Sequence, residues 1–302
     1  MINYTFVIPH KNSPDLLLRC INSIPQRIDI EIIVVDDNSP IDRIPTIERT
    51  GVNLIQLGEK ESNGAGHARN VGLSQAKGKW LLFADSDDYY ENGFIDILDK
   101  SKDEELDILY FRYYNNDGIN KTTDTVWTDL MYDNYINSSK TKEDIMHLGL
   151  ATTSLWNKMY SHKFITSIGC CFEEIPMGND AWFVNYAGVH ARKIKVINDR
   201  LYDYLQIPSG ITLQKRPLSH HKALIESDKK RNVLKRNAGC YDLLLPPGFN
   251  KDVVIRDFGR MTYYFLFLKR FFTEYLFFIA VVRAAMRRLH IIPNIIITNA
   301  QD

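Results

Sequence analysis

Apolar and polar positions alternate over the first hundred residues in a way that separates strands from helices. Four nearly continuous apolar segments predict buried strands at residues 4–8, 30–35, 53–57 and 79–84. Helical spacing of apolar residues appears at 15–24, after Ser13 and Pro14, and a second helix is expected at 66–75. Apolar strands that alternate with helices predict an α/β fold, a mostly parallel twisted sheet with helices on both faces.

The pattern becomes looser after residue 100 and helical after residue 218. Strands are expected at 106–113 and 193–204, the latter as one long strand or a strand pair, and helices at 143–150 and 178–188. A charged helix at 219–236 is expected to be exposed, and a long helical stretch follows at 251–290. The chain therefore reads as an α/β domain with a C-terminal helical extension.

Composition excludes several classes of protein. The 302-residue chain has 37 basic and 37 acidic side chains, so no overall positive field favours nucleic acid as a partner. Its four cysteines lack metal-ligand spacing and are expected to be reduced thiols. The chain enters a strand-like segment without a basic leader, and charges interrupt its most apolar region, 263–286. We therefore expect a cytoplasmic protein.

Three carboxylates, Asp85, Asp87 and Asp88, follow the fourth predicted strand. Carboxylates that lie this close repel one another, and a hard divalent cation such as Mg²⁺ or Mn²⁺ removes the conflict because it prefers oxygen ligands and often shares them with phosphate. The loop therefore indicates a metal site for a diphosphate-bearing substrate. The alternative is a solvated acidic turn that caps a helix starting near Glu91.

Two further loops carry candidate binding groups. Asp36 and Asp37 end the second strand, where a carboxylate can accept hydrogen bonds from a ribose or a base, cap the next segment, or belong to a phosphate-receiver domain. Asn63-Gly64-Ala65-Gly66 opens a helix whose N-terminus favours anions, with Arg69 one turn further on. This glycine pattern matches neither the dinucleotide fingerprint nor a phosphate-binding Walker loop.

Five motifs together resemble glycosyltransferase family 2, which has the GT-A fold. They are Val7-Ile8-Pro9, Val34-Val35-Asp36-Asp37-Asn38-Ser39, Gly66-His67-Ala68-Arg69-Asn70-Val71-Gly72, Ala76-Lys77-Gly78-Lys79 and Phe83-Ala84-Asp85-Ser86-Asp87-Asp88. The resemblance is strong over residues 4–100 and moderate to about 205. It implies a GT-A catalytic domain at 1–210, with a nucleotide-sugar-binding half at 1–100 and an acceptor-binding half at 101–210, and a helical region at 211–302.

The resemblance also implies roles for particular residues. Pro9, Asp37 and Arg69 are implied to contact the nucleotide, usually a uridine diphosphate. Asp85-Ser86-Asp87 matches the family's Asp-x-Asp motif, so Asp87 is implied to ligate Mn²⁺ or Mg²⁺, and Asp85 to hold the ribose or to assist the metal through water. We expect three neighbours in the same loops to contribute to nucleotide-sugar binding as well: Lys11, Asn63 and Ser86.

The family also places a catalytic carboxylate roughly 90 residues after the Asp-x-Asp motif. Met177-Gly178-Asn179-Asp180 supplies Asp180 at that distance, with Asn179 where members usually have glutamate. An inverting transfer needs such a base to deprotonate the acceptor hydroxyl, and a nearby helix start would keep it ionised. The alternative is a simple helix N-cap, and Glu173 and Glu174 are the reserve candidates for the base.

The C-terminal stretch interleaves aromatic, apolar and basic residues. Seven basic residues between 256 and 288 alternate with tyrosines and phenylalanines between 263 and 278. This composition suits peripheral contact with the inner face of a membrane, and equally suits helices that pack on the catalytic domain or on a partner subunit. Membrane contact would agree with a polyprenyl-diphosphate-linked acceptor.

These observations predict a cytoplasmic, metal-dependent, inverting hexosyltransferase of surface polysaccharide synthesis. The expected partners are a nucleotide-sugar donor, with uridine diphosphate as the carrier, and a saccharide or lipid-linked saccharide acceptor. Two alternatives remain: a non-catalytic binding or scaffold protein on the same fold, and a nucleotidyltransferase. The second would need a glycine-rich loop after the first strand, and Pro9-His10-Lys11-Asn12 contains no glycine.

Overall fold

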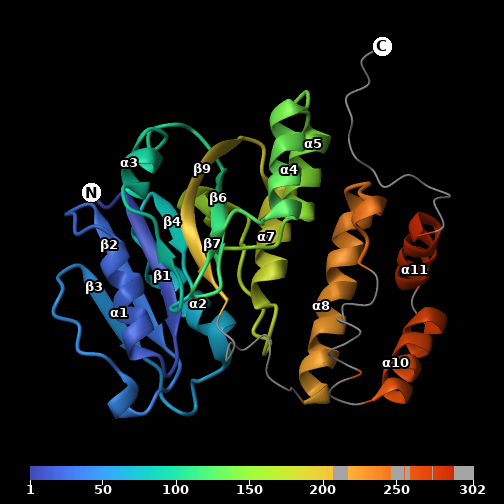
Figure 1. Cartoon of the computed structure of the whole chain (residues 1–302), viewed down its shortest axis with the longest axis horizontal. Helices are drawn as coiled ribbons and strands as arrows, with labels where there is room; N and C mark the ends of the chain where they lie inside the picture. Colours follow the sequence, from blue (N-terminus) through green and yellow to red (C-terminus); the bar gives the residue numbers. More distant parts are fainter. Residues whose placement is uncertain (207–216, 246–254, 256–258, 274, 289–302) are drawn as a thin grey trace.

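The N-terminal half of the chain forms the parallel sheet that the apolar segments predict. The computed structural model describes residues 1–206, 217–245, 255, 259–273 and 275–288 (Figure 1). Four strands run parallel in the order β3-β2-β1-β4: β1 (Tyr4–His10), β2 (Ile30–Asp36), β3 (Val52–Gln56) and β4 (Trp80–Phe83). Because β1 lies centrally and is buried along its whole length, both of its faces need apolar cover.

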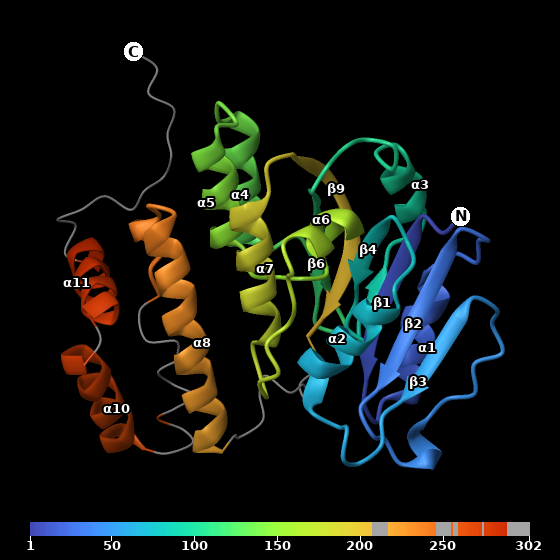
Figure 2. The ribbon, with the colours of Figure 1, turned by 180° about the vertical axis from the view of Figure 1, so that it is seen from behind.

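Helices cover the two faces of this sheet separately. On one face, α1 (Pro14–Ser23) packs Leu17 and Ile21 against Phe6, in a core that also takes in α3 (Phe94–Asp99). On the other face, α2 (Gly64–Gln75) approaches so closely that a Cβ on Gly72 would lie 2.5 Å from Val7 Cγ1 (Figures 1 and 2). Phe6 and Val7 are neighbours in the chain and point to opposite faces, as the strand period requires.

The second half extends the same sheet with mixed polarity. β8 (Lys158–Ser161) pairs antiparallel with β4 and with β6 (Ile108–Asn116), and β6 pairs parallel with β9 (Ile194–Leu205). The segment expected as one long strand or a strand pair is thus one long strand. The remaining short elements are η1 (Ile41–Arg43), β5 (Tyr89–Tyr90), β7 (Lys121–Thr122) and η3 (Tyr241–Leu243).

Four helices cover this half of the sheet on the α2 side: α4 (Val126–Asn137), α5 (Lys142–Ala151), α6 (His162–Ser167) and α7 (Asn179–His190). α5 and α7 cross at a pair of glycines, where a Cβ on Gly188 would lie 2.4 Å from the Cα of Gly149. Phe183 of α7 stacks on Phe172 with ring centroids 4.1 Å apart and is fully buried. This packing fixes the start of α7 against the edge of the sheet.

The C-terminal helices differ from expectation in two respects. The charged helix, α8 (Leu218–Asn237), is not generally exposed, because Ser227, Asp228, Arg231, Asn232 and Lys235 are buried and the helix packs against α7. The final stretch contains two helices, α10 (Arg260–Thr273) and α11 (Tyr275–Arg288), instead of one. Both lie at the far end of the molecule from β3, outside α8 (Figure 2). Among the helices that the structure describes, none is long and apolar enough to cross a bilayer.

Candidate active site

The polar loops after β1, β2 and β4 meet at one edge of the sheet because these strands run parallel. The register pairs His10 with Asp36, so β1 and β2 end level, and it pairs Val7 with Phe83, so β4 ends at the same edge but opposite a residue nearer the start of β1. Ligands bind at this edge of open α/β sheets. The candidate residues of the three loops are therefore brought together as the sequence predicts.

Asp36 anchors the loop that carries Asp37. His10 Nδ1 lies 2.7 Å from Asp36 Oδ1, and Ser39 donates its hydroxyl and its backbone N–H to the same carboxylate at 2.6 and 2.8 Å. The backbone N–H of Ser13 donates to His10 Nε2, so the ring proton is assigned to Nδ1 and the imidazole is neutral. All of these groups are engaged with one another, and Asp36 fixes the backbone from which Asp37 projects.

Asp37 holds the start of α2. Its Oδ1 accepts hydrogen bonds from the backbone N–H groups of Asn63 and Gly64 at 3.1 and 3.3 Å, and its Oδ2 accepts one from Lys11 Nζ at 3.0 Å. The structure thus brings Lys11, Asn63 and Asp37 together in one cluster. Pro9 lies beside them in buried β1, paired with Val35.

Arg69 links the acidic loop to the start of α7. This buried guanidinium donates from Nη2 to Asp85 Oδ1 and from Nη1 to Asn179 Oδ1, both at 2.5 Å. Its Nε is buried and has no acceptor among the described residues. Charge-assisted hydrogen bonds of this kind are strong and geometrically specific. Arg69 therefore holds Asp85 beside the residue that precedes Asp180, although 95 residues of sequence separate those two aspartates.

Asp87 and Asp88 occupy different environments in the acidic loop. Asp88 is fully buried and accepts hydrogen bonds from Tyr202 Oη and the Leu205 backbone N–H at 2.8 and 2.7 Å, so it anchors the loop to β9. Burial and the neighbouring Asp85 charge raise the pKa of Asp87 to about 6. The loop does not cap a helix near Glu91, because β5 follows it directly and α3 begins only at Phe94 behind an αL Gly93.

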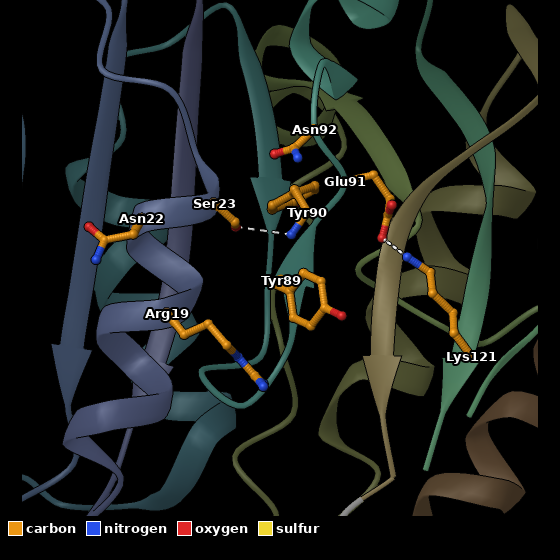
Figure 3. A pocket seen from close by; sticks show the side chains of 8 residues that line it. All are labelled: Arg19, Asn22, Ser23, Tyr89, Tyr90, Glu91, Asn92 and Lys121. Atoms are coloured by element: carbon orange, nitrogen blue, oxygen red, sulfur yellow. Dashed lines mark hydrogen bonds and ion pairs between the residues drawn. The ribbon is translucent and has the colours of Figure 1, made fainter. Parts of the chain in front are cut away.

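A cavity lies behind the acidic loop, between α1 and β5 (Figure 3). Its volume is about 460 Å³, and its polar wall is formed largely by Arg19, Asn22, Tyr89, Glu91, Asn92 and Lys121. Arg19 donates a hydrogen bond to the carbonyl oxygen of Asp87 and lies over the Tyr89 ring, 4.8 Å from its centroid. The Arg19 guanidinium thus holds the acidic loop from the side of this cavity.

Asp180 is the second residue of α7 and not its cap. The N-cap is Gly178, which has a φ of 66°. Burial raises the pKa of Asp180, with Asp85 adding to the rise and the Arg69 charge opposing it. The Asp180 side chain is therefore close enough to interact with the charges of Arg69 and Asp85, and its surroundings make the carboxylate a stronger base.

The two reserve candidates, Glu173 and Glu174, lie in a chain segment that crosses the site, and we call this segment the strap. Glu174 accepts hydrogen bonds from Asn63 and Asn70 of the donor half at 3.0 and 3.2 Å and lies 2.9 Å from His67. Glu173 is bound by Lys230 of α8 at 2.7 Å and by Ser227. Both carboxylates are thus engaged in holding the segment in place.

Gly66 permits this strap to pass. A Cβ at this position would lie 2.2 Å from the Glu173 carbonyl oxygen, so the glycine is required by the strap itself. The space beside this glycine is thus taken by another backbone segment.

Two buried cations near Asp180 were not predicted from the sequence. Lys158 is fully buried on β8, burial lowers its pKa to about 7, and it interacts with the Asp180 charge. Arg231 of α8 donates from Nε to Asn185 Oδ1 at 2.9 Å and also interacts with that charge. No local sequence pattern indicates that Lys158 is buried or that α8 turns a polar face inward.

The metal that the sequence implies finds suitable donors in the acidic loop. Asp87 offers carboxylate oxygen, the ligand type of Mg²⁺ and Mn²⁺, and the described part of the chain supplies it with no side-chain hydrogen-bond donor. A cation there would relieve the repulsion that raises its pKa. Over the described residues, no group of three His, Cys, Asp or Glu side chains could hold a metal by itself.

The fold and this edge define a class: an α/β protein with an Asp-x-Asp sequence after β4, a polar cluster at the ends of the first strands and a buried carboxylate, Asp180, near both. The family model described as glycosyl transferase family 2 matches residues 5–167, more than half of the chain. The chain belongs to glycosyltransferase family 2, and its fold is the GT-A fold.

Curated relatives and solved structures agree with this assignment. The chain is 25% identical to glycosyltransferase EpsJ of Bacillus subtilis over 69% of its own length and 62% of EpsJ. It is also 25% identical to the poly(ribitol-phosphate) beta-N-acetylglucosaminyltransferase TarS of Staphylococcus aureus, over 68% of its length and 35% of TarS. It thus spans less than two thirds of either relative. The structure of TarS 1–349 in complex with UDP-GlcNAc superposes with a TM-score of 0.62 at 22% identity, over 88% of this chain and 76% of that one.

Proposed function

We propose that the chain is a metal-dependent, inverting hexosyltransferase of surface polysaccharide synthesis. In this proposal it takes a sugar from a uridine diphosphate donor in the cytoplasm and passes it to a glycan or a polyprenyl-diphosphate-linked acceptor. The family assignment supports glycosyl transfer, and the UDP-GlcNAc named for the TarS structure supports the donor class. The observation that carries the proposal is the Arg69 bridge, which joins the acidic loop to the start of the helix that bears Asp180.

The donor is proposed to lie along the edge formed by the first strands and the acidic loop. Pro9, Lys11, Asp37 and Asn63 would contact the base, because they form one cluster beside the start of α2. Arg69, Asp85 and Ser86 would take the ribose and phosphates at the other end. The free Nε–H of Arg69 offers one donor for this purpose. Asp87, with Asp85 assisting, would hold Mn²⁺ or Mg²⁺, which supplies positive charge against the departing diphosphate.

Asp180 is proposed to be the general base. It would remove the proton of the acceptor hydroxyl while that oxygen attacks the anomeric carbon from the face opposite the diphosphate, which inverts the configuration. Its raised pKa suits this role, because a base is most effective when its pKa approaches the working pH. The oxygens of Glu173 and Glu174 are already engaged by the strap.

Calorimetry with uridine diphosphate and manganese tests the donor site. Asp87→Ala should weaken nucleotide binding in the presence of manganese by roughly tenfold or more, because it removes the proposed metal ligand. Asp96→Ala is the matched control, since Asp96 is exposed on α3. Nucleotide binding that is equally tight without manganese and in Asp87→Ala would contradict the metal assignment.

Turnover measurements test the base. Asp180→Asn should lower kcat by about 10²- to 10⁴-fold while the affinity for uridine diphosphate stays within a few-fold. Glu173→Gln is the comparison variant. Loss of turnover in Glu173→Gln with retention in Asp180→Asn would transfer the role to the strap, and nucleotide binding without any turnover would favour the non-catalytic alternative.

A further inference from the structure

Helix α10 exposes a continuous apolar stripe. Met261, Tyr264, Phe265, Leu268 and Phe272 follow a spacing of three or four residues and so lie on one face of the helix. Their exposed fractions run from 49% to 87%. The opposite side is packed: Tyr263 is buried, and α10 contacts α11, which in turn contacts α8.

This stripe differs from the other exposed apolar residues of the chain. Those outside the last two helices are single, for example Ile28, Ile119 and Val233, or at most paired, as Trp127 and Leu130 are on α4, and such residues are ordinary on protein surfaces. Five large apolar side chains on one 14-residue helix form a contiguous patch. Patches of this kind mark a surface that a membrane or another molecule covers.

The charge beside the stripe indicates what covers it. The two last helices contain six basic residues and no acidic residue, although the whole chain is electrically balanced. Arg260 and Lys269 are exposed on α10 itself. An apolar stripe with basic flanks is the pattern of a helix that lies in the plane of an anionic membrane surface. A two-fold dimer through this face would set the same basic surface against itself, which is unfavourable.

We propose that α10 docks the protein on anionic membrane lipid, lying flat with its stripe among the acyl chains. A 14-residue helix is about 21 Å long, shorter than the roughly 30 Å hydrocarbon core, so it would lie in the surface and not cross. α10 lies at the lower side of the view in Figure 1, where β1 and β2 also end, although at the opposite end of the long axis. Resting on the proposed function, docking through α10 would hold the active site near the surface that carries lipid-linked acceptors.

Vesicle flotation of the full chain, without nucleotide or acceptor, tests the proposal independently of any transfer activity. Vesicles of phosphatidylcholine mixed with phosphatidylglycerol should bind the protein roughly tenfold or more tightly than vesicles of phosphatidylcholine alone, and added salt should reduce this preference. Phe265→Ser with Phe272→Ser should abolish binding. The matched control is Ile28→Ser with Ile119→Ser, which removes two equally exposed apolar residues from loops and should leave binding unchanged.

Two results would overturn the proposal. One is absence of binding to both kinds of vesicle, with a mass in sedimentation velocity that falls in the Phe265→Ser, Phe272→Ser variant; the stripe would then be a protein interface. The other is equal binding to both kinds of vesicle or retained binding in that variant. Circular dichroism that matches the parent chain shows that the variant is folded, and failure of glycosyl transfer leaves this measurement unaffected.

Discussion

Asp180 is the residue at which burial bears most directly on rate. Burial raises its pKa, so the carboxyl takes up a proton at a higher pH than an ordinary aspartate, whose pKa is about 3.9. A base acts only in its ionised form. We therefore expect kcat/KM to fall as the pH decreases through this raised pKa, with the acidic limb above the ordinary aspartate range.

The metal site offers the control for this pH profile. At saturating manganese the limb should keep its position when the manganese concentration is changed, because Asp180 is not a proposed ligand. A limb that moves with manganese would belong to the acidic loop and would contradict the assignment to Asp180.

The inward polar face of α8 buries Lys235, and this burial makes the charged form of its side chain less stable. Burial lowers its pKa to about 7, whereas an unfolded lysine has a pKa near 10.4. Between these values the unfolded chain binds more protons than the folded chain, so this residue makes the free energy of unfolding rise with pH. Lys235→Met should remove that dependence. The free energy of unfolding of the variant minus that of the parent chain should therefore decrease by about 2 kcal/mol from neutral pH to about pH 9.

Urea unfolding across this pH range measures the effect. Lys222→Met, on the exposed side of the same helix, is the matched control and should leave the pH dependence unchanged. Equal pH dependence in the parent chain and in Lys235→Met would show that Lys235 is solvated in the folded protein.

At the scale of elements, the contact between α5 and α7 depends on two glycines. Alanine is intrinsically better than glycine in a helix by about 1 kcal/mol, so Gly188→Ala would stabilise α7 if nothing opposed it. Its Cβ would however meet the Gly149 Cα at 2.4 Å, well inside ordinary contact. We expect Gly188→Ala to lower the free energy of unfolding by about 1–3 kcal/mol, because the helices must separate.

Denaturant titration of both single variants and of the double variant checks this prediction. Gly149→Ala should cost a similar amount, and the double variant should cost less than the two together, since one separation relieves both clashes. A gain in stability in either single variant would contradict the close crossing.

The strands of the donor half and most of the first helices could be predicted from the sequence because their signals are local. Residues 30–35 are apolar throughout, and β2 lies there with both faces covered. β8 was not predicted, since Lys158–Ser161 has no apolar period and is a strand only through its pairing with β4 and β6. The inward polar face of α8 could not be predicted for the same reason, because Arg231 is buried through its contact with Asn185, 46 residues away.

The candidate site divides in the same way. The loops that hold Asp37, Arg69 and Asp87 could be located because each follows a recognisable strand or opens a helix. Their connection could not, because Arg69 reaches Asn179 across 110 residues. The link that Glu173 and Glu174 make between α2 and α8 could not be predicted either, because its partners are distant in the sequence.

At the scale of the whole molecule, α8 is connected to the α/β body by polar contacts. The sequence predicts a boundary near residue 210, and α8 beyond it supplies Lys230 to the strap at 2.7 Å and Arg231 to Asn185 of α7 at 2.9 Å. Asn185 in turn donates to the carbonyl of Gly149 at 3.0 Å, so the network extends into α5. The contacts favour a functional boundary after η3, near residue 245, with α10 and α11 as the separable part.

A pair of truncations distinguishes the two boundaries. A chain that ends at residue 245 keeps α8, the strap and every described contact around Asp180, so its affinity for uridine diphosphate with manganese should stay within about threefold of the parent while its binding to anionic vesicles is lost. A chain that ends at 206 leaves Glu173 without Lys230 and Asn185 without Arg231. Unpaired buried polar groups cost about 1–3 kcal/mol each, so we expect this shorter chain to unfold at lower denaturant and to bind the nucleotide at least about tenfold more weakly. If it proves insoluble, Arg231→Met in the full chain tests the same link. Nucleotide affinity and stability at parent levels in the chain that ends at 206 would restore the boundary near 210, because α8 would then add nothing to the site it contacts.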